Sequence, residues 1–199
     1  MALQDFLPIY NKTVSSSHFT CRHFLPQAFD LEMKKENRFQ KPVFNAEPGR
    51  QITWKLVNQI CEDTTNFYYH TGLPQLWIIL LGTNNIRFQE EDLIPYYKTL
   101  SDHIVNVPKC HFIYCALVPS IGTDNDSKKR FKAANSGIKK LCNSSPKTTF
   151  FNTPEYLTIQ GKIVEEYYED KYHLSKKGAN HVALQLRKRV SHIPNIAFQ

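Results

Sequence analysis

Six consecutive large apolar residues, 76–81, end abruptly at the sequence Gly-Thr-Asn-Asn. An apolar segment of this length, bounded by a turn sequence, is typical of a strand that is buried on both faces of a parallel sheet. Open sheets of that kind place their binding and catalytic sites at the carboxyl ends of the strands. We therefore expect an α/β protein in which residues 82–85 lie at a functional edge of the sheet.

A second segment, near the end of the chain, could reach the same edge. It reads Asp170-Lys-Tyr-His173-Leu-Ser-Lys-Lys-Gly178 and precedes an apolar-periodic stretch, 179–190. An Asp and a His three residues apart, in a loop just before a helix, can both point toward the end of a sheet. We expect this loop to contribute to the site.

Hydrophobic periodicity predicts alternating strands and helices along the whole chain. Strands are expected at 6–17, 41–45, 76–81, 111–118 and 148–152, and helices at 18–33, 51–66, 90–107, 126–142 and 175–191. The first strand is the most polar, with Asn, Lys and a serine run. The alternation predicts a three-layer α/β/α sandwich with a central parallel sheet of about five strands.

Composition bounds the organisation of the chain. Its 199 residues, 41% of them hydrophobic, suffice for one sizeable core, and no linker divides them, so we expect a single domain, 1–199. The domain-like length also suggests a fragment of a longer protein.

The longest apolar run is too short to cross a bilayer and the start lacks signal-peptide features, so we expect a cytoplasmic protein without a membrane partner. Five scattered cysteines predict reduced thiols rather than disulfides or a metal site.

The charge balance is uneven, with 25 Lys and Arg against 18 Asp and Glu and a net charge of +7. Such a surplus favours polyanionic partners, although many basic proteins bind none. Charge alone therefore leaves nucleic-acid binding open.

The order of the motifs resembles that of the SGNH (GDSL) hydrolase superfamily. The chain has a serine-containing turn near its amino end, a Pro-Gly turn, the apolar strand ending in Gly-Thr-Asn-Asn, and Asp-x-x-His-Leu-Ser-x-x-Gly before a terminal helix. This resemblance covers nearly the whole chain. It implies an SGNH hydrolase-like fold and a mechanism without a metal or organic cofactor.

The resemblance also implies roles for individual residues. Ser17 would be the nucleophile, His173 the base and Asp170 the carboxylate that orients the base. The backbone N–H of Gly49 and the side-chain amide of Asn84 would form the oxyanion hole. Such donors are worth on the order of 3 kcal/mol each, because they hold the charge that develops on the substrate oxygen.

Two sequence blocks depart from the family pattern. The first block, normally Gly-Asp-Ser, is Ser15-Ser16-Ser17 here, and Asn85 occupies the position of the Asp that usually follows the oxyanion-hole Asn. Losing the first-block glycine places a Cβ beside the oxyanion site, and a displacement of one ångström can lower a rate about a hundredfold. These departures argue against an efficient esterase.

Two branches of the family are similar to this chain. One is the esterase domain of some non-long-terminal-repeat retrotransposon proteins, which keeps Gly-Asp-Ser. The other is the OSK domain of the insect germ-plasm protein Oskar, which is held to be non-enzymatic and binds messenger RNA through surface Arg and Lys. The degenerate first block and the net charge favour the second branch, whereas the retained Asp170 and His173 favour the first.

We therefore predict a non-catalytic RNA-binding module that acts in mRNA localisation, with protein partners in a ribonucleoprotein assembly. The alternative is a serine esterase that uses Ser17, His173 and Asp170. Cationic contacts to phosphate and aromatic stacking would bind single-stranded RNA or mRNA 3′ regions. The residues expected to form this surface are Arg22, His23, Lys34, Lys35, Arg38, Arg50, Arg87, Lys171, Lys176 and Lys177. Separate basic clusters, 128–140 and 187–189, are interpreted as solvated helix faces.

Overall fold

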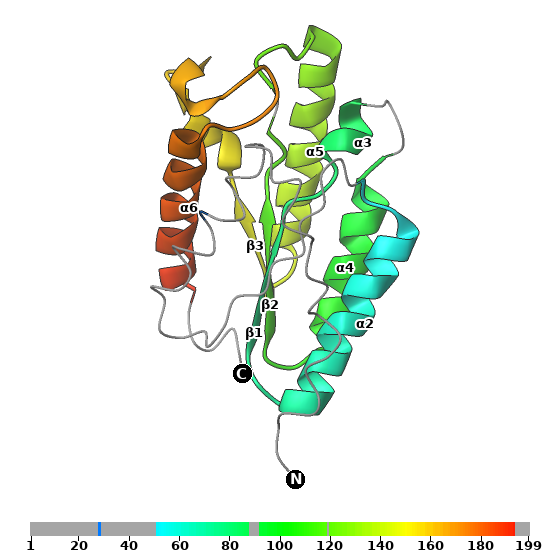
Figure 1. Cartoon of the computed structure of the whole chain (residues 1–199). Helices are drawn as coiled ribbons and strands as arrows, with labels where there is room; N and C mark the ends of the chain where they lie inside the picture. The colour runs from blue at the N-terminus through cyan, green and yellow to red at the C-terminus, as the bar shows by residue number, and fades with distance from the viewer. Residues whose placement is uncertain (1–27, 29–50, 88–91, 119, 194–199) are drawn as a thin grey trace, which may run out of the picture.

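The computed structural model describes residues 28, 51–87, 92–118 and 120–193. Its elements, in chain order, are α2 (Trp54–Thr71), β1 (Gln75–Ile79), α3 (Thr83–Arg87), α4 (Ile94–Val105), β2 (Cys110–Cys115), α5 (Asn125–Asn143), β3 (Thr148–Phe151), the 3₁₀ helix η2 (Thr153–Leu157), the strands β4 (Thr158–Ile159) and β5 (Lys162–Ile163), the 3₁₀ helix η3 (Glu165–Tyr167) and α6 (Lys176–Ser191) (Figure 1). The strands predicted at 76–81, 111–118 and 148–152 are confirmed, as are the helices at 51–66, 90–107, 126–142 and 175–191.

The amino-terminal predictions fall on residues that the structure does not describe. These are the strands at 6–17 and 41–45 and most of the helix at 18–33. Ala28 alone is described there, and it is helical and buried.

Three parallel strands form the described part of the main sheet, in the order β1-β2-β3. Trp77 lies opposite Phe112 in the first pair, and Phe112 lies opposite Thr148 in the second. Strands β4 and β5 form a separate antiparallel hairpin. The two remaining strands of the predicted five-stranded sheet would come from the residues outside the description.

Side chains of the sheet alternate between two apolar cores. Phe112 and Tyr114 of β2 belong to a core shared with α2, α4 and α5. Ile113 and Cys115 belong to a second core, shared with α6. Figure 1 shows the helices on opposite sides of the strands, so the predicted three-layer α/β/α arrangement is confirmed. Strand β2 is buried along its whole length, as the apolar pattern requires.

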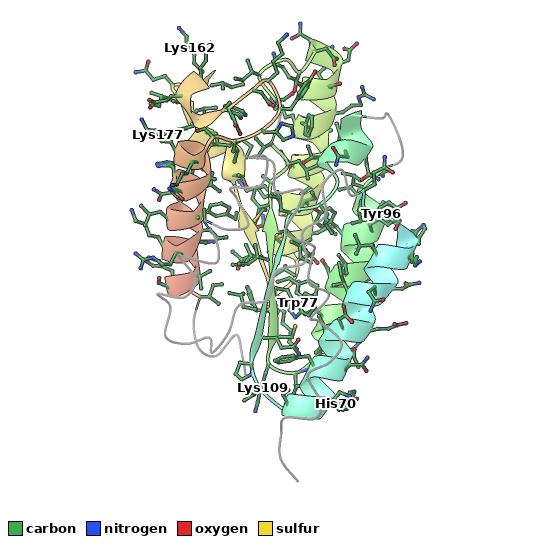
Figure 2. All side chains as sticks on the ribbon, in the orientation of Figure 1. His70, Trp77, Tyr96, Lys109, Lys162 and Lys177 are labelled. Atoms are coloured by element: carbon green, nitrogen blue, oxygen red, sulfur yellow. The ribbon has the colours of Figure 1, made fainter. Side chains whose placement is uncertain are left out.

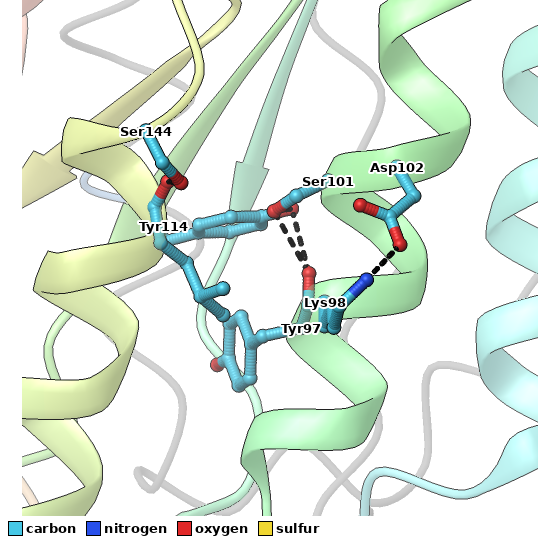
Figure 3. Close-up of polar contacts among 7 residues, drawn as sticks. Tyr97, Lys98, Ser101, Asp102, Tyr114 and Ser144 are labelled. Atoms are coloured by element: carbon cyan, nitrogen blue, oxygen red, sulfur yellow. Dashed lines mark hydrogen bonds and ion pairs between the residues drawn. The ribbon is translucent and has the colours of Figure 1, made fainter.

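A polar network inside the first core ties α4 to the sheet (Figure 3). The Ser101 hydroxyl donates to the Tyr97 carbonyl at 2.8 Å and lies 3.0 Å from the Tyr114 hydroxyl, which leaves the Tyr114 hydroxyl as donor. The Tyr97 hydroxyl donates to the Leu81 carbonyl at 2.8 Å. Because a buried hydroxyl without a partner is costly, these bonds fix α4 against the carboxyl end of β1.

The cysteines in the described residues are free thiols. Cys110, Cys115 and Cys142 are buried and Cys61 is partly buried. Burial raises the pKa of Cys110 and of Cys115 to about 12. These thiols act as small apolar groups of the cores.

Helix α6 begins at Lys176, after the loop that follows η3. Ser175 caps the helix by accepting a hydrogen bond from the Gly178 N–H at 3.2 Å. A Cβ added at Gly178 would collide with the Tyr167 backbone carbonyl. The glycine therefore allows the first turn of α6 to pack directly against η3.

We expect Gly178→Ala to lower the free energy of unfolding by about 1–3 kcal/mol, because a backbone carbonyl cannot move aside. Gly137→Ala in α5 is the matched control, since the added Cβ there meets only the end of the Ile94 side chain, which can rotate. Urea unfolding of the two variants provides the measurement. Equal losses at both positions would contradict the close approach at Gly178.

Candidate active site

Asp170 and His173 form a hydrogen-bonded pair in the loop between η3 and α6. The His173 Nδ1 lies 2.8 Å from one carboxylate oxygen of Asp170 and 3.0 Å from the other. An ionised carboxylate can only accept, so Nδ1 carries the proton and the lone pair of a neutral ring is on Nε2. The side chains are 34% and 44% exposed for His173 and Asp170, so a substrate can reach the ring.

The Asp170 carboxylate also organises the backbone around it. One oxygen accepts hydrogen bonds from the N–H groups of Tyr172 at 2.6 Å and of His173 at 2.8 Å. The hydrogen bond from His173 and the backbone N–H groups lower the pKa of Asp170 to about 2. Asp170 is therefore ionised at neutral pH, as a partner for an imidazolium must be.

The loop that carries the pair is closed on itself like a small hairpin. The Glu169 N–H donates to the His173 carbonyl at 2.9 Å, and Tyr168 and Leu174 form an antiparallel bridge. Ser175 donates its hydroxyl hydrogen to the Glu166 carbonyl at 2.8 Å while it caps α6. The geometry of the pair thus depends on bonds within about ten residues of chain.

One backbone bond connects this loop to the parallel sheet. The Ile121 N–H, in the segment that follows β2, donates to the Lys171 carbonyl at 2.9 Å. The segment leaves the carboxyl end of β2, so the pair lies beside the edge at which parallel sheets carry their sites.

Asn84 lies in α3, which follows the carboxyl end of β1, and it is partly buried. In Figure 1, α3 and the loop before α6 are both at the top of the view. The fold thus places Asn84 and the Asp170–His173 pair at one end of the sheet. Ser17 and Gly49 lie outside the described residues, so their assignment as nucleophile and oxyanion donor stays a prediction.

Three lysines of the predicted RNA surface surround the same loop. Lys171 is in the loop, and Lys176 and Lys177 form the first turn of α6. Lys177 pairs with Glu166 at 2.7 Å, and this carboxylate raises the pKa of Lys177. Figure 2 shows Lys177 toward the end of the molecule opposite Lys109.

The other members of that predicted surface are less defined. Arg87 is the last residue of α3. Arg22, His23, Lys34, Lys35, Arg38 and Arg50 lie outside the described residues.

A basic cleft that the sequence did not predict lies along β3. It has a volume of about 360 Å³, and its lining includes Lys139 of α5, Arg189 of α6, Thr149 of β3, Asn152 just before η2, and Glu155 and Tyr156 of η2. Helix α5 carries six Lys or Arg and one Asp, and α6 carries five Lys or Arg and no acidic residue. These two helices therefore carry a net charge of +10, which exceeds the +7 of the whole chain. Lys139 and Arg189 are far apart in sequence, and the packing of both helices brings them to one cleft.

The described part of the chain contains no group of three His, Cys, Asp or Glu side chains that could hold a metal ion. None of its helices has the length and apolarity that a membrane crossing requires.

The chain matches no protein-family profile and no curated protein sequence. Its fold is nevertheless similar to that of solved esterases. A family 3 carbohydrate esterase from Clostridium thermocellum superimposes with a TM-score of 0.58 at 16% identity, over 86% of this chain and 88% of the other. A family 3 carbohydrate esterase from Talaromyces cellulolyticus gives 0.56 at 14% identity, over 87% and 91%. A mutant acetyl esterase solved with an acetate ion gives 0.53 at 15% identity, over 86% and 93%. At such identities the likeness establishes the fold alone, and it agrees with the predicted α/β/α class.

The Asp170–His173 pair predicts a titration that can be measured by carbon-13 NMR of the Asp170 carboxyl group. Its pKa is depressed from 3.8 to about 2, so the stability it contributes is complete above the unfolded value and is lost as the pH falls through the folded one. We expect a midpoint near 2 in the native protein. His173→Ala should move the midpoint upward, because the largest cause of the depression is then removed. A native midpoint near 3.8 would contradict the pair.

Proposed function

We propose that this protein hydrolyses short acyl esters, with acetyl esters as the substrate class. The observation that carries the proposal is the Asp170–His173 pair, which fixes the imidazole with Nε2 as the basic nitrogen in an accessible loop. The esterase fold and the acetyl and carbohydrate esterases that share it give further support. In the described residues, Nε2 of His173 has no hydrogen-bond partner, so it is available to a nucleophile.

The chemistry follows from these groups and the predicted ones. Nε2 of His173 takes the hydroxyl proton of Ser17 as the serine oxygen attacks the ester carbonyl carbon. The Asn84 amide and the Gly49 N–H stabilise the oxyanion, and the imidazolium returns its proton to the departing alcohol. Water, activated by the same imidazole, then releases the acyl group as a carboxylic acid. Asp170 stays ionised throughout and stabilises the imidazolium.

An assay with p-nitrophenyl acetate tests the proposal. His173→Ala and Ser17→Ala should reduce turnover to the background rate. Asp170→Asn should lower kcat by about 10³–10⁴-fold, because an amide can donate to Nδ1 and stabilise the wrong tautomer.

Two replacements serve as matched controls for that assay. His192→Ala removes an imidazole at the far end of α6, whose Nδ1 donates to the Lys188 carbonyl. Ser16→Ala removes a hydroxyl next to the proposed nucleophile. Both should retain wild-type turnover, and a wild type no faster than His173→Ala would refute the proposal.

A second candidate function, RNA binding, is favoured by the basic cleft along β3. Lys139 and Arg189 line it from two helices, and Tyr156 of η2 also lines it, with its ring stacked on Phe151 at 5.1 Å between centroids. Cations beside an aromatic ring are suited to single-stranded RNA, whose phosphates and bases both find partners. Such a role would resemble that of the OSK domain, and it is compatible with ester hydrolysis at the opposite end of α6.

Fluorescence anisotropy with a labelled single-stranded RNA, measured across a salt series, tests this second function. Lys139→Glu and Arg189→Glu should each weaken binding and lower the slope of log affinity against log salt by about 1. Lys98→Glu is the control, because Lys98 pairs with Asp102 on α4 (Figure 3) and is not among the residues that line the cleft. Equal losses in all three variants would exclude the cleft as the RNA site.

A further inference from the structure

The side chain of Asn85 is paired with the backbone of a residue far away in the sequence. Its Oδ1 accepts from the Ile52 N–H at 2.9 Å, and its Nδ2 donates to the Ile52 carbonyl at 3.0 Å. Asn85 is 3% exposed, so it is sealed from solvent and from any substrate. The amide thus joins α3 to the segment that enters α2.

We infer that Asn85 is a positioning residue, which holds Asn84 where its side chain can donate to the oxyanion. This inference rests on the proposed ester hydrolysis. Helix α3 spans only Thr83–Arg87, and a helix this short has no stability of its own in water. The orientation of Asn84 must therefore be imposed by contacts of α3 with the rest of the fold.

Two other contacts hold the chain just before α3, and neither fixes the helix itself. The Tyr97 hydroxyl bonds the Leu81 carbonyl, which precedes the turn. Gly82 has a φ of 95°, and a Cβ there would lie 2.8 Å from Cδ1 of Leu93. Within the helix, Ile86 packs into the first core, and the Asn85 pairing, directly beside Asn84, adds the hydrogen bonds that hold α3 in one rotation about its axis.

An amide is required for this pairing, which explains why the chain has Asn where the family pattern has Asp. A carboxylate could accept from the Ile52 N–H but could not donate to the Ile52 carbonyl. It would also bring a negative charge into a buried site beside a carbonyl oxygen. The departure from the family pattern thus fits the local hydrogen bonding of this chain.

An oxyanion donor acts chiefly in the transition state, so a displaced Asn84 should lower kcat and leave KM nearly unchanged. Asn85→Asp removes one donor with little change of volume. We expect its kcat for p-nitrophenyl acetate to fall by about ten- to a hundredfold, the loss typical of a displacement of about one ångström.

The matched control is Gln75→Glu, the same change from amide to carboxylate at the amino end of β1. Gln75 is 4% exposed, and its Nε2 donates to the Thr64 carbonyl at 2.9 Å. Both variants lose one buried bond to a carbonyl, and both should unfold at a lower temperature. Measured where both are folded, Gln75→Glu should keep the wild-type kcat. If Asn85→Asp does not fold, Asn85→Ser replaces it under the same criteria.

A double-mutant cycle separates positioning from general destabilisation. If Asn85 acts through Asn84, Asn85→Asp should have almost no further effect on kcat in an Asn84→Ala background. A wild-type kcat in Asn85→Asp, or full additivity of the two changes, would overturn the inference. A wild type no faster than His173→Ala would have a different meaning, because the proposed hydrolysis, and with it this role of Asn85, would then be wrong.

Discussion

Burial of β2 on both faces is the constraint on which the rest of the structure depends. Phe112 and Tyr114 fill one core and Ile113 and Cys115 fill the other, so helices must cover both sides of the sheet. Parallel strands in turn need crossover helices, which return each strand to the same direction. The loops after the strands consequently gather at one end, where α3 and the loop before α6 are found.

Two groups of polar residues lie at that end of the sheet. Bonds within one loop hold the Asp170–His173 pair, whereas bonds to distant parts of the chain hold α3, which carries Asn84. The Asp170–His173 pair is set by bonds within its own loop and needs only one backbone link to the segment after β2. The position of Asn84, in contrast, depends on hydrogen bonds that residues near it make with distant parts of the chain. Leu81 bonds Tyr97 of α4, and Asn85 bonds Ile52 before α2. The Asp170–His173 pair is therefore the more autonomous part of the candidate site, and the position of Asn84 is the part that tertiary packing determines.

Sequence patterns identified the elements whose signal is periodic or local. The apolar run before Gly82 located β1, and the Asp-x-x-His spacing located a pair that forms within one loop. The hairpin of β4 and β5 was missed because two-residue strands have no periodicity. The pairing of Asn85 with Ile52 and the approach of Lys139 and Arg189 across β3 involve residues distant in sequence, so neither has a local pattern. Helix α2 extends to Thr71, beyond the predicted residue 66, because its left-handed end is at Gly72.

The two functions of the Asp170 carboxylate have an evolutionary consequence. The carboxylate that bonds the His173 ring also accepts two backbone N–H groups, so the folded loop requires Asp170 with or without the proposed hydrolysis. The His173 side chain, in the described residues, bonds Asp170 alone. Retention of the imidazole would therefore reflect the proposed chemistry rather than folding. Among natural variants of this chain, loss of the histidine with retention of the aspartate would then mark loss of the proposed hydrolysis.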